Sequence, residues 1–434
     1  MRRSIALAGT GLLSAALLTA VPGAASAAPS GDAFYTPPAQ LPSANGAIVR
    51  SEPQDLGVSI PGLLGSKQLP GTATRLMYRS TDDAGRAVAV TGSYIEPTTG
   101  WSGTGPRPLV AFASGTQGQG DACAPSKTLS TPINVSTGSL SLGYEVPQIY
   151  TLLNQGIAVV VTDYVGLGTP DRLHTYTNRN DLGHAVLDAA RAARNLPGTS
   201  LTGSTPIGLY GYSQGGGATG AAAELAPSYA PELNIKGAYV GAPPSDLLAV
   251  LKKVDGTALT GVIGYAINGL VEYSSELRAI LDRETNQAGK DALAKVKNQC
   301  IGDSLLSFGL KKTSGWTKSG QSAAQIVEAN PAAMAAVERQ RLGKVKPTVP
   351  VMVLTGTKDD IVEHGQAKKV AQDWCALGAT VTYTPVNQLL DSLGTALNHL
   401  TPVFLNAGAA QSWLVDRFNG KPVESSCGTI AQQP

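Results

Sequence analysis

The stretch that most constrains this chain covers residues 207–217, Ile-Gly-Leu-Tyr-Gly-Tyr-Ser-Gln-Gly-Gly-Gly. Its first half is an apolar run typical of a short buried strand, and a run of small residues after it predicts a helix. Ser213 lies between them in a G-x-S-x-G pattern. In a nucleophile elbow the serine occupies a strained strand-to-helix turn, so the residues two away must lack side chains. The pattern alone occurs often by chance, but here the strand and the helix supply the context that an elbow requires.

The first 27 residues have the features of an export signal. Arg2 and Arg3 precede an apolar run over residues 5–21, and Ala25-Ser26-Ala27 forms an A-x-A cleavage site. We therefore expect a secreted protein with a Sec-type signal cleaved after Ala27, although the two arginines would also suit a twin-arginine route. No later stretch is long and apolar enough to predict a membrane span.

The charge balance of the chain does not point to nucleic acid or an anionic membrane as a partner. The whole chain has a net charge of +2, and two of its arginines leave with the signal. A mature protein of about zero net charge gives no reason to expect nucleic acid or an anionic membrane as a partner. With 15% charged residues and 50 glycines, the composition suits a compact secreted enzyme.

Four cysteines in an exported chain predict two disulfides. Of the three possible pairings we favour Cys123 with Cys300 and Cys375 with Cys427, because the second pair would attach the C-terminal tail to the fold. No cysteine or histidine pair has the spacing of metal ligands, so neither a metal nor a cofactor is expected.

Apolar runs that alternate with helical segments predict an α/β fold. An antiparallel hairpin is expected first, over residues 73–80 and 86–95, whereas residues 34–70 show no clear period and are interpreted as an extended surface arm. Residues 181–194 predict a helix with Asp181 as its N-cap. Continuously apolar strands indicate a mostly parallel sheet covered on both faces, and they are expected at 108–113, 157–162, 207–210, 235–240, 349–354 and 380–386.

One long segment interrupts this alternation. Residues 244–346 show helical patterning and no convincing strand, and a simple crossover would require far fewer residues. We interpret this segment as an inserted helical cap, which divides the core into residues 28–243 and 347–434. Within the cap, residues 259–267 are notably apolar and could be either cap core or a surface that faces substrate.

A serine nucleophile requires a base within hydrogen-bond reach, and that base must be oriented by an acid. In chains with this kind of elbow the order is serine, acid, then histidine. His174 and His184 precede Ser213 and do not fit this order. Of the two histidines that follow, His399 comes after the last predicted strand and is favoured over His364.

The acid is expected in the loop that follows the strand at 349–354. Asp359 and Asp360 are both candidates, and because they are adjacent their side chains should point in different directions. An oxyanion hole would also require two backbone N–H groups. The amide of Gln214 is one candidate, and the loop 114–118 offers either Gly115 or Thr116 as the second, with Thr116 preferred.

Several short elements together resemble the secretory lipase (LIP) family. They are Phe34-Tyr35-Thr36-Pro37-Pro38, Gly115-Thr116, Cys123-Ala124-Pro125-Ser126, Asp163-Tyr164-Val165-Gly166-Leu167-Gly168, Gly211-Tyr212-Ser213-Gln214-Gly215, Asp359-Asp360-Ile361-Val362 and Asn398-His399-Leu400. The Cys-Ala-Pro-Ser and Asp-x-Ile-Val elements are the more specific, because general hydrolases do not share them. The resemblance implies an α/β-hydrolase fold with a helical cap.

The resemblance also implies a triad of Ser213, Asp359 and His399, since the acid of the family occupies the first position of Asp-x-Ile-Val. The chain departs from the family at Glu363-His364, where proline is common. His364 is therefore close enough in sequence to perturb the pKa of Asp359 or to act as an alternative partner for it.

These features predict a secreted serine carboxylic-ester hydrolase, most simply a lipase that acts on acylglycerols through an acyl-enzyme on Ser213. An esterase or acyltransferase that acts on another bulky ester or a polyester would use the same triad. A non-catalytic binding protein with this fold is less favoured, because every triad position is kept. The expected partner is an ester or lipid, taken up at a lipid–water interface.

Overall fold

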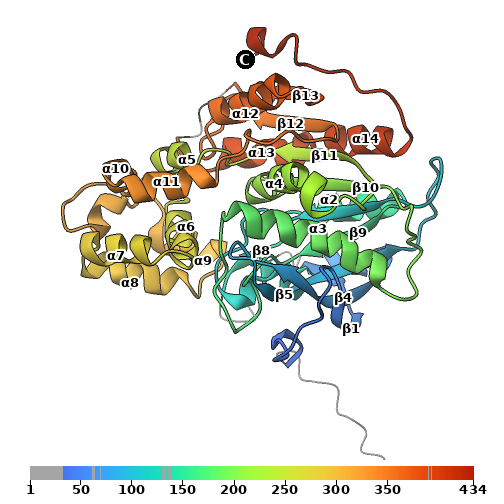
Figure 1. Ribbon diagram of the computed structural model, residues 1–434, viewed down its shortest axis with the longest axis horizontal. Coiled ribbons are helices and arrows are strands. Elements are labelled where there is room, and N and C mark those ends of the chain that lie inside the picture. The colour runs from blue at the N-terminus through green and yellow to red at the C-terminus, as the bar shows by residue number, and fades with distance from the viewer. Residues whose placement is uncertain are drawn as a thin grey trace, which may run out of the picture.

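The computed structural model describes residues 33–60, 64–68, 70–129, 133–134, 139–389, 391 and 393–434. The predicted signal segment and its cleavage site lie outside these residues. A nine-stranded sheet forms the centre of the molecule, in the order β1-β4-β5-β9-β6-β10-β11-β12-β13 (Figure 1). Its strands are β1 (Ile48–Gln54), β4 (Gly71–Thr81), β5 (Ala87–Pro97), β6 (Leu109–Ala113), β9 (Ala158–Thr162), β10 (Ile207–Tyr212), β11 (Ile235–Gly241), β12 (Val351–Gly356) and β13 (Val381–Val386).

The sheet is parallel from β9 to β13, and β1, β4 and β5 extend it with antiparallel pairs. Helices α3 (Arg179–Asn195), α4 (Gln214–Tyr229) and α12 (His364–Ala376) cover one face, while α2 (Val146–Asn154), α13 (Leu397–Leu405) and α14 (Ala407–Phe418) cover the other. Because both faces are covered, β6, β9, β10 and β12 are buried along their whole length. The predicted parallel sheet with a leading hairpin is confirmed.

The prediction of an extended surface arm over residues 34–70 is wrong. Strand β1 joins the edge of the sheet beside β4, and β2 (Gly57–Ile60) pairs with β3 (Leu64–Gln68). Phe34 and Tyr35 are buried against Met77 and Ala89. An edge strand that covers little core has no strict apolar alternation, so its sequence gives no periodic signal.

The prediction that Asp181 caps α3 is also wrong. The helix begins two residues earlier, and the Asn178 side chain accepts hydrogen bonds from the amides of Asn180 and Asp181. The Asp181 carboxylate instead accepts hydrogen bonds from the Thr175 and Tyr273 hydroxyls. Burial raises the pKa of Asp181 to about 6.

Helices fill the chain between β11 and β12, as the sequence predicts. They gather beside one end of the sheet, where Figure 1 draws most of them in yellow and orange. Several of them share an apolar core of their own, which includes Val254, Ile263 and Val296. The helices are α5 (Leu247–Val254), α6 (Gly261–Val271), α7 (Ser275–Glu284), α8 (Gln287–Val296), α9 (Ile301–Phe308), α10 (Ala323–Ala329) and α11 (Pro331–Arg339). We refer to residues 244–346 as the cap.

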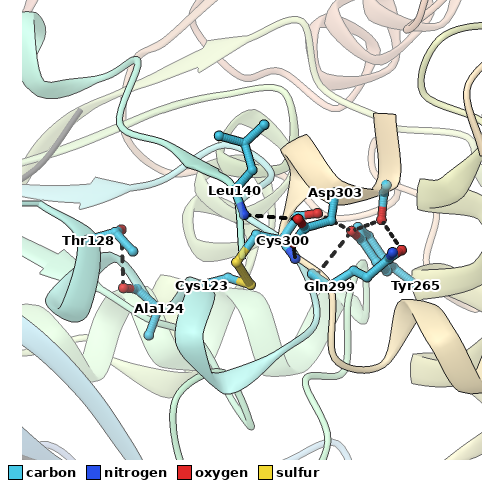
Figure 2. The surroundings of a disulfide bond; sticks show 9 residues. Cys123, Ala124, Thr128, Leu140, Tyr265, Gln299, Cys300 and Asp303 are labelled. Atoms are coloured by element: carbon cyan, nitrogen blue, oxygen red, sulfur yellow. Dashed lines mark hydrogen bonds between the residues drawn. A yellow bond between two sulfur atoms is a disulfide. The ribbon is translucent and has the colours of Figure 1, made fainter. Parts of the chain in front are cut away.

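The cysteines form the disulfides Cys123–Cys300 and Cys375–Cys427, which is the pairing favoured from the sequence. The first of them joins the core loop after β6 to the start of α9 in the cap (Figure 2). The side chain of Asp303 accepts hydrogen bonds from the amides of Cys300 and Leu140, so the cap is also held to the chain before β8 (Ser141–Leu142). Within the described part of the chain, no helix has the length and apolar composition needed to cross a bilayer.

Candidate active site

The turn between β10 and α4 has the geometry of a nucleophile elbow. Ser213 has φ 58° and ψ −122°, a conformation that L residues rarely adopt. A Cβ atom on Gly211 would lie 2.3 Å from the Gly215 carbonyl oxygen, and one on Gly215 would lie 2.0 Å from that of Ala113. The two glycines of the G-x-S-x-G pattern are therefore required by contacts of the backbone with itself and with β6, as the sequence predicts.

A continuous series of hydrogen bonds joins Ser213 to His399 and Asp359. The Ser213 Oγ lies 2.9 Å from His399 Nε2, and His399 Nδ1 lies 2.7 Å from Asp359 Oδ2. With Nδ1–H donating to the carboxylate, Nε2 is free to accept the serine proton. The other oxygen of Asp359 accepts the amides of Ile361 and Val362, each at 2.9 Å. These two hydrogen bonds explain the Asp-x-Ile-Val element, because the aspartate at its first position accepts the amides of the Ile and the Val.

The neighbours of the triad residues hold the histidine backbone. Asp360 accepts hydrogen bonds from the amides of His399 and Ala396, at 3.1 and 2.8 Å, and the Tyr212 hydroxyl donates to the His399 carbonyl at 2.8 Å. Asp359 and Asp360 therefore point in different directions, as their adjacency predicts. One contacts the imidazole ring of His399 and the other contacts its backbone.

His364 and His184 have hydrogen-bond partners other than Ser213 and Asp359. His364 begins α12 and its Nε2 lies 3.1 Å from the Tyr383 hydroxyl, so the structure does not bring it to Asp359 as a partner. His184 contacts the Thr81 carbonyl and stacks on Tyr229. Both histidines therefore make contacts that belong to the packing of the fold.

His174 contacts Gln214, the residue that follows Ser213. It lies buried, with Nε2 3.1 Å from the side-chain amide of Gln214 and Nδ1 3.0 Å from the Val165 carbonyl. Burial lowers its pKa to about 4, so at neutral pH the ring is uncharged. A neutral ring that donates through Nδ1 can accept the Gln214 amide at Nε2. His174 thus fixes the side chain of Gln214, whose backbone amide is an oxyanion candidate.

The loop after β6 is held from the opposite side by Glu145, which the sequence reading missed. Both Glu145 carboxylate oxygens lie 3.0 Å from the Gly115 amide, inside the protein. Burial raises the pKa of Glu145 to about 8. Because Gly115 N–H already donates to Glu145, the neighbouring Thr116 amide remains the candidate for the second oxyanion donor. No sequence signal marks Glu145, since it lies 30 residues from its partner.

An apolar pocket opens over these groups. Thr116, Ser213 and Gln214 line it, together with cap residues such as Leu251, Ile263 and Ile267. A second apolar cavity among the cap helices shares Leu251, Ile267 and Leu270 with the first. Residues 259–267 contribute both to the cap core and to the wall of the pocket that Ser213 lines. The interpretation as cap core is confirmed, and the interpretation as a surface that faces substrate stays a prediction.

Residues 130–426 match the secretory lipase family, which is more than half of the chain. The chain belongs to this family. Secretory lipases are carboxylic-ester hydrolases, and membership agrees with the export that the N-terminal residues predict. Lipase 4 of Candida albicans is 30% identical over 410 residues, which cover 92% of this chain and 83% of the relative. A probable inactive lipase of Mycobacterium tuberculosis is 30% identical over 396 residues, 91% and 83% of the two chains.

A solved structure gives the same fold. The closed state of Candida antarctica lipase A superposes with a TM-score of 0.75 at 22% identity, covering 92% of this secretory lipase and 88% of that chain. At this identity the likeness shows the fold alone. The architecture is that of an α/β-hydrolase, as the resemblance implied.

Proposed function

We propose that this secretory lipase hydrolyses acylglycerols through an acyl-enzyme on Ser213, with His399 as base and Asp359 as its orienting acid. The observation that carries the proposal is the series of hydrogen bonds from Asp359 through His399 to Ser213 Oγ, which lies in the lining of an apolar pocket. We further propose that the protein is exported by its N-terminal signal and cleaved after Ala27.

In the first half of the reaction Ser213 Oγ attacks the ester carbonyl carbon while His399 Nε2 takes the serine proton. The amides of Thr116 and Gln214 donate to the oxyanion that forms. As the tetrahedral intermediate collapses, His399 returns the proton to the leaving alcohol and the acyl group stays on Ser213. In the second half water attacks the acyl-enzyme, again with His399 as base, and the fatty acid leaves.

The pocket wall supports a long acyl chain as the group that Ser213 receives. The cap supplies aliphatic side chains around the serine, and the cavity beyond shares part of this wall. Apolar lining with few polar groups suits a hydrocarbon chain, whose transfer from water is favourable in proportion to the area buried.

Hydrolysis of an emulsified triacylglycerol and of a soluble p-nitrophenyl ester tests the proposal. Ser213→Ala and His399→Ala should each lower turnover of both esters by roughly 10⁴-fold or more. Ser228→Ala on α4 and His364→Ala are matched controls, because Ser228 is exposed and His364 contacts Tyr383 instead of the triad. Activity that persists in Ser213→Ala would show that another nucleophile carries the reaction.

One relative is a probable inactive lipase, so a binding protein without turnover is the second candidate. A fluorophosphonate probe distinguishes the two, because it labels only a serine that is activated by its base. We expect labelling of the wild type and none of Ser213→Ala. An unlabelled wild type that still binds lipid would favour the binding protein.

A further inference from the structure

A pair of hydroxyl groups lies in the lining of the pocket to which Ser213 also contributes. The Thr116 and Tyr176 side chains both line this pocket, and Thr116 Oγ1 lies 2.7 Å from the Tyr176 hydroxyl oxygen. Each hydroxyl carries one proton, and the hydrogen bond between them uses only one of the two. Among the described residues neither hydroxyl has a further hydrogen-bond partner. One proton of the pair is therefore left for a group that enters the pocket.

Another pair of the same kind, in the core, shows the contrast. The Tyr78 hydroxyl lies 2.7 Å from Thr162 Oγ1 and also donates to the Ala185 carbonyl at 3.0 Å. Both protons of that pair are taken by protein groups, because Thr162 donates to Tyr78 and Tyr78 donates to Ala185. The pair of Thr116 and Tyr176 lacks such a third group. A buried pair that is complete without a ligand is structural, whereas the pair in the pocket is complete only when an acceptor arrives.

Tyr176 is held in place by ring contacts with both the core and the cap. Its ring meets the ring of His174 edge-on at a centroid distance of 6.0 Å, and that of Tyr265 on α6 at 5.6 Å. The Tyr265 hydroxyl lies 3.3 Å from the carbonyl oxygen of Cys300, beside the disulfide (Figure 2). Burial raises the pKa of Tyr176 to about 12, so the phenol keeps its proton at neutral pH. Tyr176 is therefore a fixed and neutral hydroxyl that can orient Thr116.

Thr116 is also the residue whose backbone amide is the second oxyanion candidate. The amide and the hydroxyl of a threonine are carried by its neighbouring Cα and Cβ atoms, so one acceptor can contact both. When Tyr176 donates to Thr116 Oγ1, the Thr116 proton is free to point toward that acceptor. Thr116 is buried, and a hydrogen bond made in such surroundings is stronger than one made in water.

We propose that the Thr116 hydroxyl is a third donor to the oxyanion that forms when Ser213 attacks an ester, and that the Tyr176 hydroxyl orients it. The inference deepens the proposed function and rests on it, because this oxyanion arises only in that reaction. Thr116 is then a catalytic residue through its side chain, and Tyr176 is a positioning residue that acts through Thr116. Charge develops on the carbonyl oxygen in the transition state, so the hydroxyl should act on kcat more than on KM.

The kcat and KM of a soluble p-nitrophenyl ester test the role of Thr116. Thr116→Val keeps the backbone amide and the side-chain shape but removes the hydroxyl, so kcat should fall roughly 10²-fold while KM stays within about threefold. Thr116→Ser keeps a hydroxyl and should hold kcat within roughly fivefold of wild type. The matched control is Thr355→Val, because the hydroxyl of Thr355 is also buried but has no hydrogen-bond partner among the described residues. It should keep the wild-type kcat.

Tyr176→Phe tests the positioning role. This variant keeps the ring and loses the hydroxyl that orients Thr116, so kcat should fall by roughly 3- to 10-fold. In Thr116→Val there is no hydroxyl to orient, so Thr116→Val/Tyr176→Phe should be no slower than Thr116→Val alone. Tyr78→Phe is the matched control, because it removes a hydroxyl from the buried pair in the core. It should lower stability and leave kcat unchanged.

Inhibition by an alkyl trifluoromethyl ketone gives a readout that a purely structural role would not change. Ser213 Oγ adds to the carbonyl carbon of the ketone, His399 takes the serine proton, and the carbonyl oxygen becomes an oxyanion. This adduct presents the charge without turnover, as a transition-state analogue does. Thr116→Val should weaken inhibition by about the same factor as it lowers kcat/KM, and Thr116→Ser should restore it.

Three results would overturn the inference. They are an unchanged kcat in Thr116→Val, a loss in Thr116→Ser equal to that in Thr116→Val, or a larger loss in Tyr176→Phe, which would place the phenol itself on the oxyanion. Thermal unfolding checks that each variant keeps the fold. If Thr116→Val does not fold, Thr116→Ala removes the same hydroxyl with less bulk and takes its place against Thr116→Ser. Failure of the proposed function is distinguishable, because the wild type would then turn over no ester.

Discussion

The contact between Glu145 and Gly115 leads to the sharpest prediction about the oxyanion loop. In Glu145→Ala the buried Gly115 N–H loses its partner, which costs about 1–3 kcal/mol and frees the loop to shift. Thr116 follows directly, so its proposed oxyanion amide moves as well. Loss of one oxyanion donor costs about 2.7–4 kcal/mol, which sets the upper limit of the effect on kcat. We therefore expect kcat to fall by roughly 10- to 10³-fold in Glu145→Ala.

Glu145→Gln separates the hydrogen bond from the charge. The amide oxygen can still accept the Gly115 N–H, so kcat should stay within roughly fivefold of wild type. Burial raises the pKa of Glu145 in the folded protein to about 8 from the ordinary value of 4.5. Between these values the folded state holds a proton that the unfolded state has lost, so the free energy of unfolding falls as pH rises from about 4.5 to about 8.

The size of this pH effect follows from the pKa difference and is roughly 5 kcal/mol at most. Glutamine has no proton to lose, so Glu145→Gln should gain stability relative to wild type as pH rises through this range. Urea unfolding at pH 5, 7 and 9 measures the difference. A difference that stays constant with pH would show that Glu145 does not titrate as its burial indicates.

Separate kcat and KM values on a soluble p-nitrophenyl ester decide whether Glu145 positions the oxyanion loop. Glu224→Ala is the matched control, because Glu224 is also buried but contacts Arg179, Trp374 and the Gly343 amide away from the site. The control should lose stability and keep kcat. If Glu145→Ala behaves in the same way, the reasoning is refuted and the residue is only structural.

Three further predictions concern the rest of the site. Asp359→Asn should lower kcat by roughly 10⁴-fold, because the carboxylate that keeps the proton on His399 Nδ1 is lost. Asp360→Asn should lower kcat far less in the same ester assay. Cys123→Ser/Cys300→Ser should lower the free energy of unfolding in urea by about 2–5 kcal/mol. A fall in kcat beside this loss would show that the disulfide also positions the loop after β6. Burial lowers the pKa of His174 from 6.5 to about 4, so the free energy of unfolding should fall as pH drops from about 6.5 to about 4. A His174→Gln variant should lack this pH dependence in acid unfolding curves.

Much of the fold was predictable because its strands are buried on both faces. Such strands are continuously apolar over four to six residues, and β6, β9 and β12 stand out in the sequence for this reason. The elbow was predictable because its glycines are a steric requirement. The order of serine, acid and histidine then restricted the remaining candidates.

Edge strands and buried polar groups were not predictable, because their causes are not local. Strand β1 is half-exposed and lacks an apolar period, so only its pairing with β4 identifies it. Glu145 looks like any acidic residue near a helix start, and its burial depends on the packing of α2 beneath the oxyanion loop. Asn178 and Asp181 both suit a cap by residue type, and the tertiary contacts of Asp181 with Tyr273 decide between them.

The elbow glycines also bear on the proposed oxyanion hole. Gly215 lies against the end of β6, where a Cβ would meet the Ala113 carbonyl oxygen at 2.0 Å and the Ser114 carbonyl carbon at 3.1 Å. Ser114 begins the loop that carries Thr116, and Gln214 lies directly before Gly215. The close approach that the glycine permits therefore brings the two candidate amides, from separate segments, to the same end of the sheet. A larger residue at Gly215 would displace the nucleophile and the oxyanion loop together, which is why the serine pattern and the loop after β6 must be interpreted as one site.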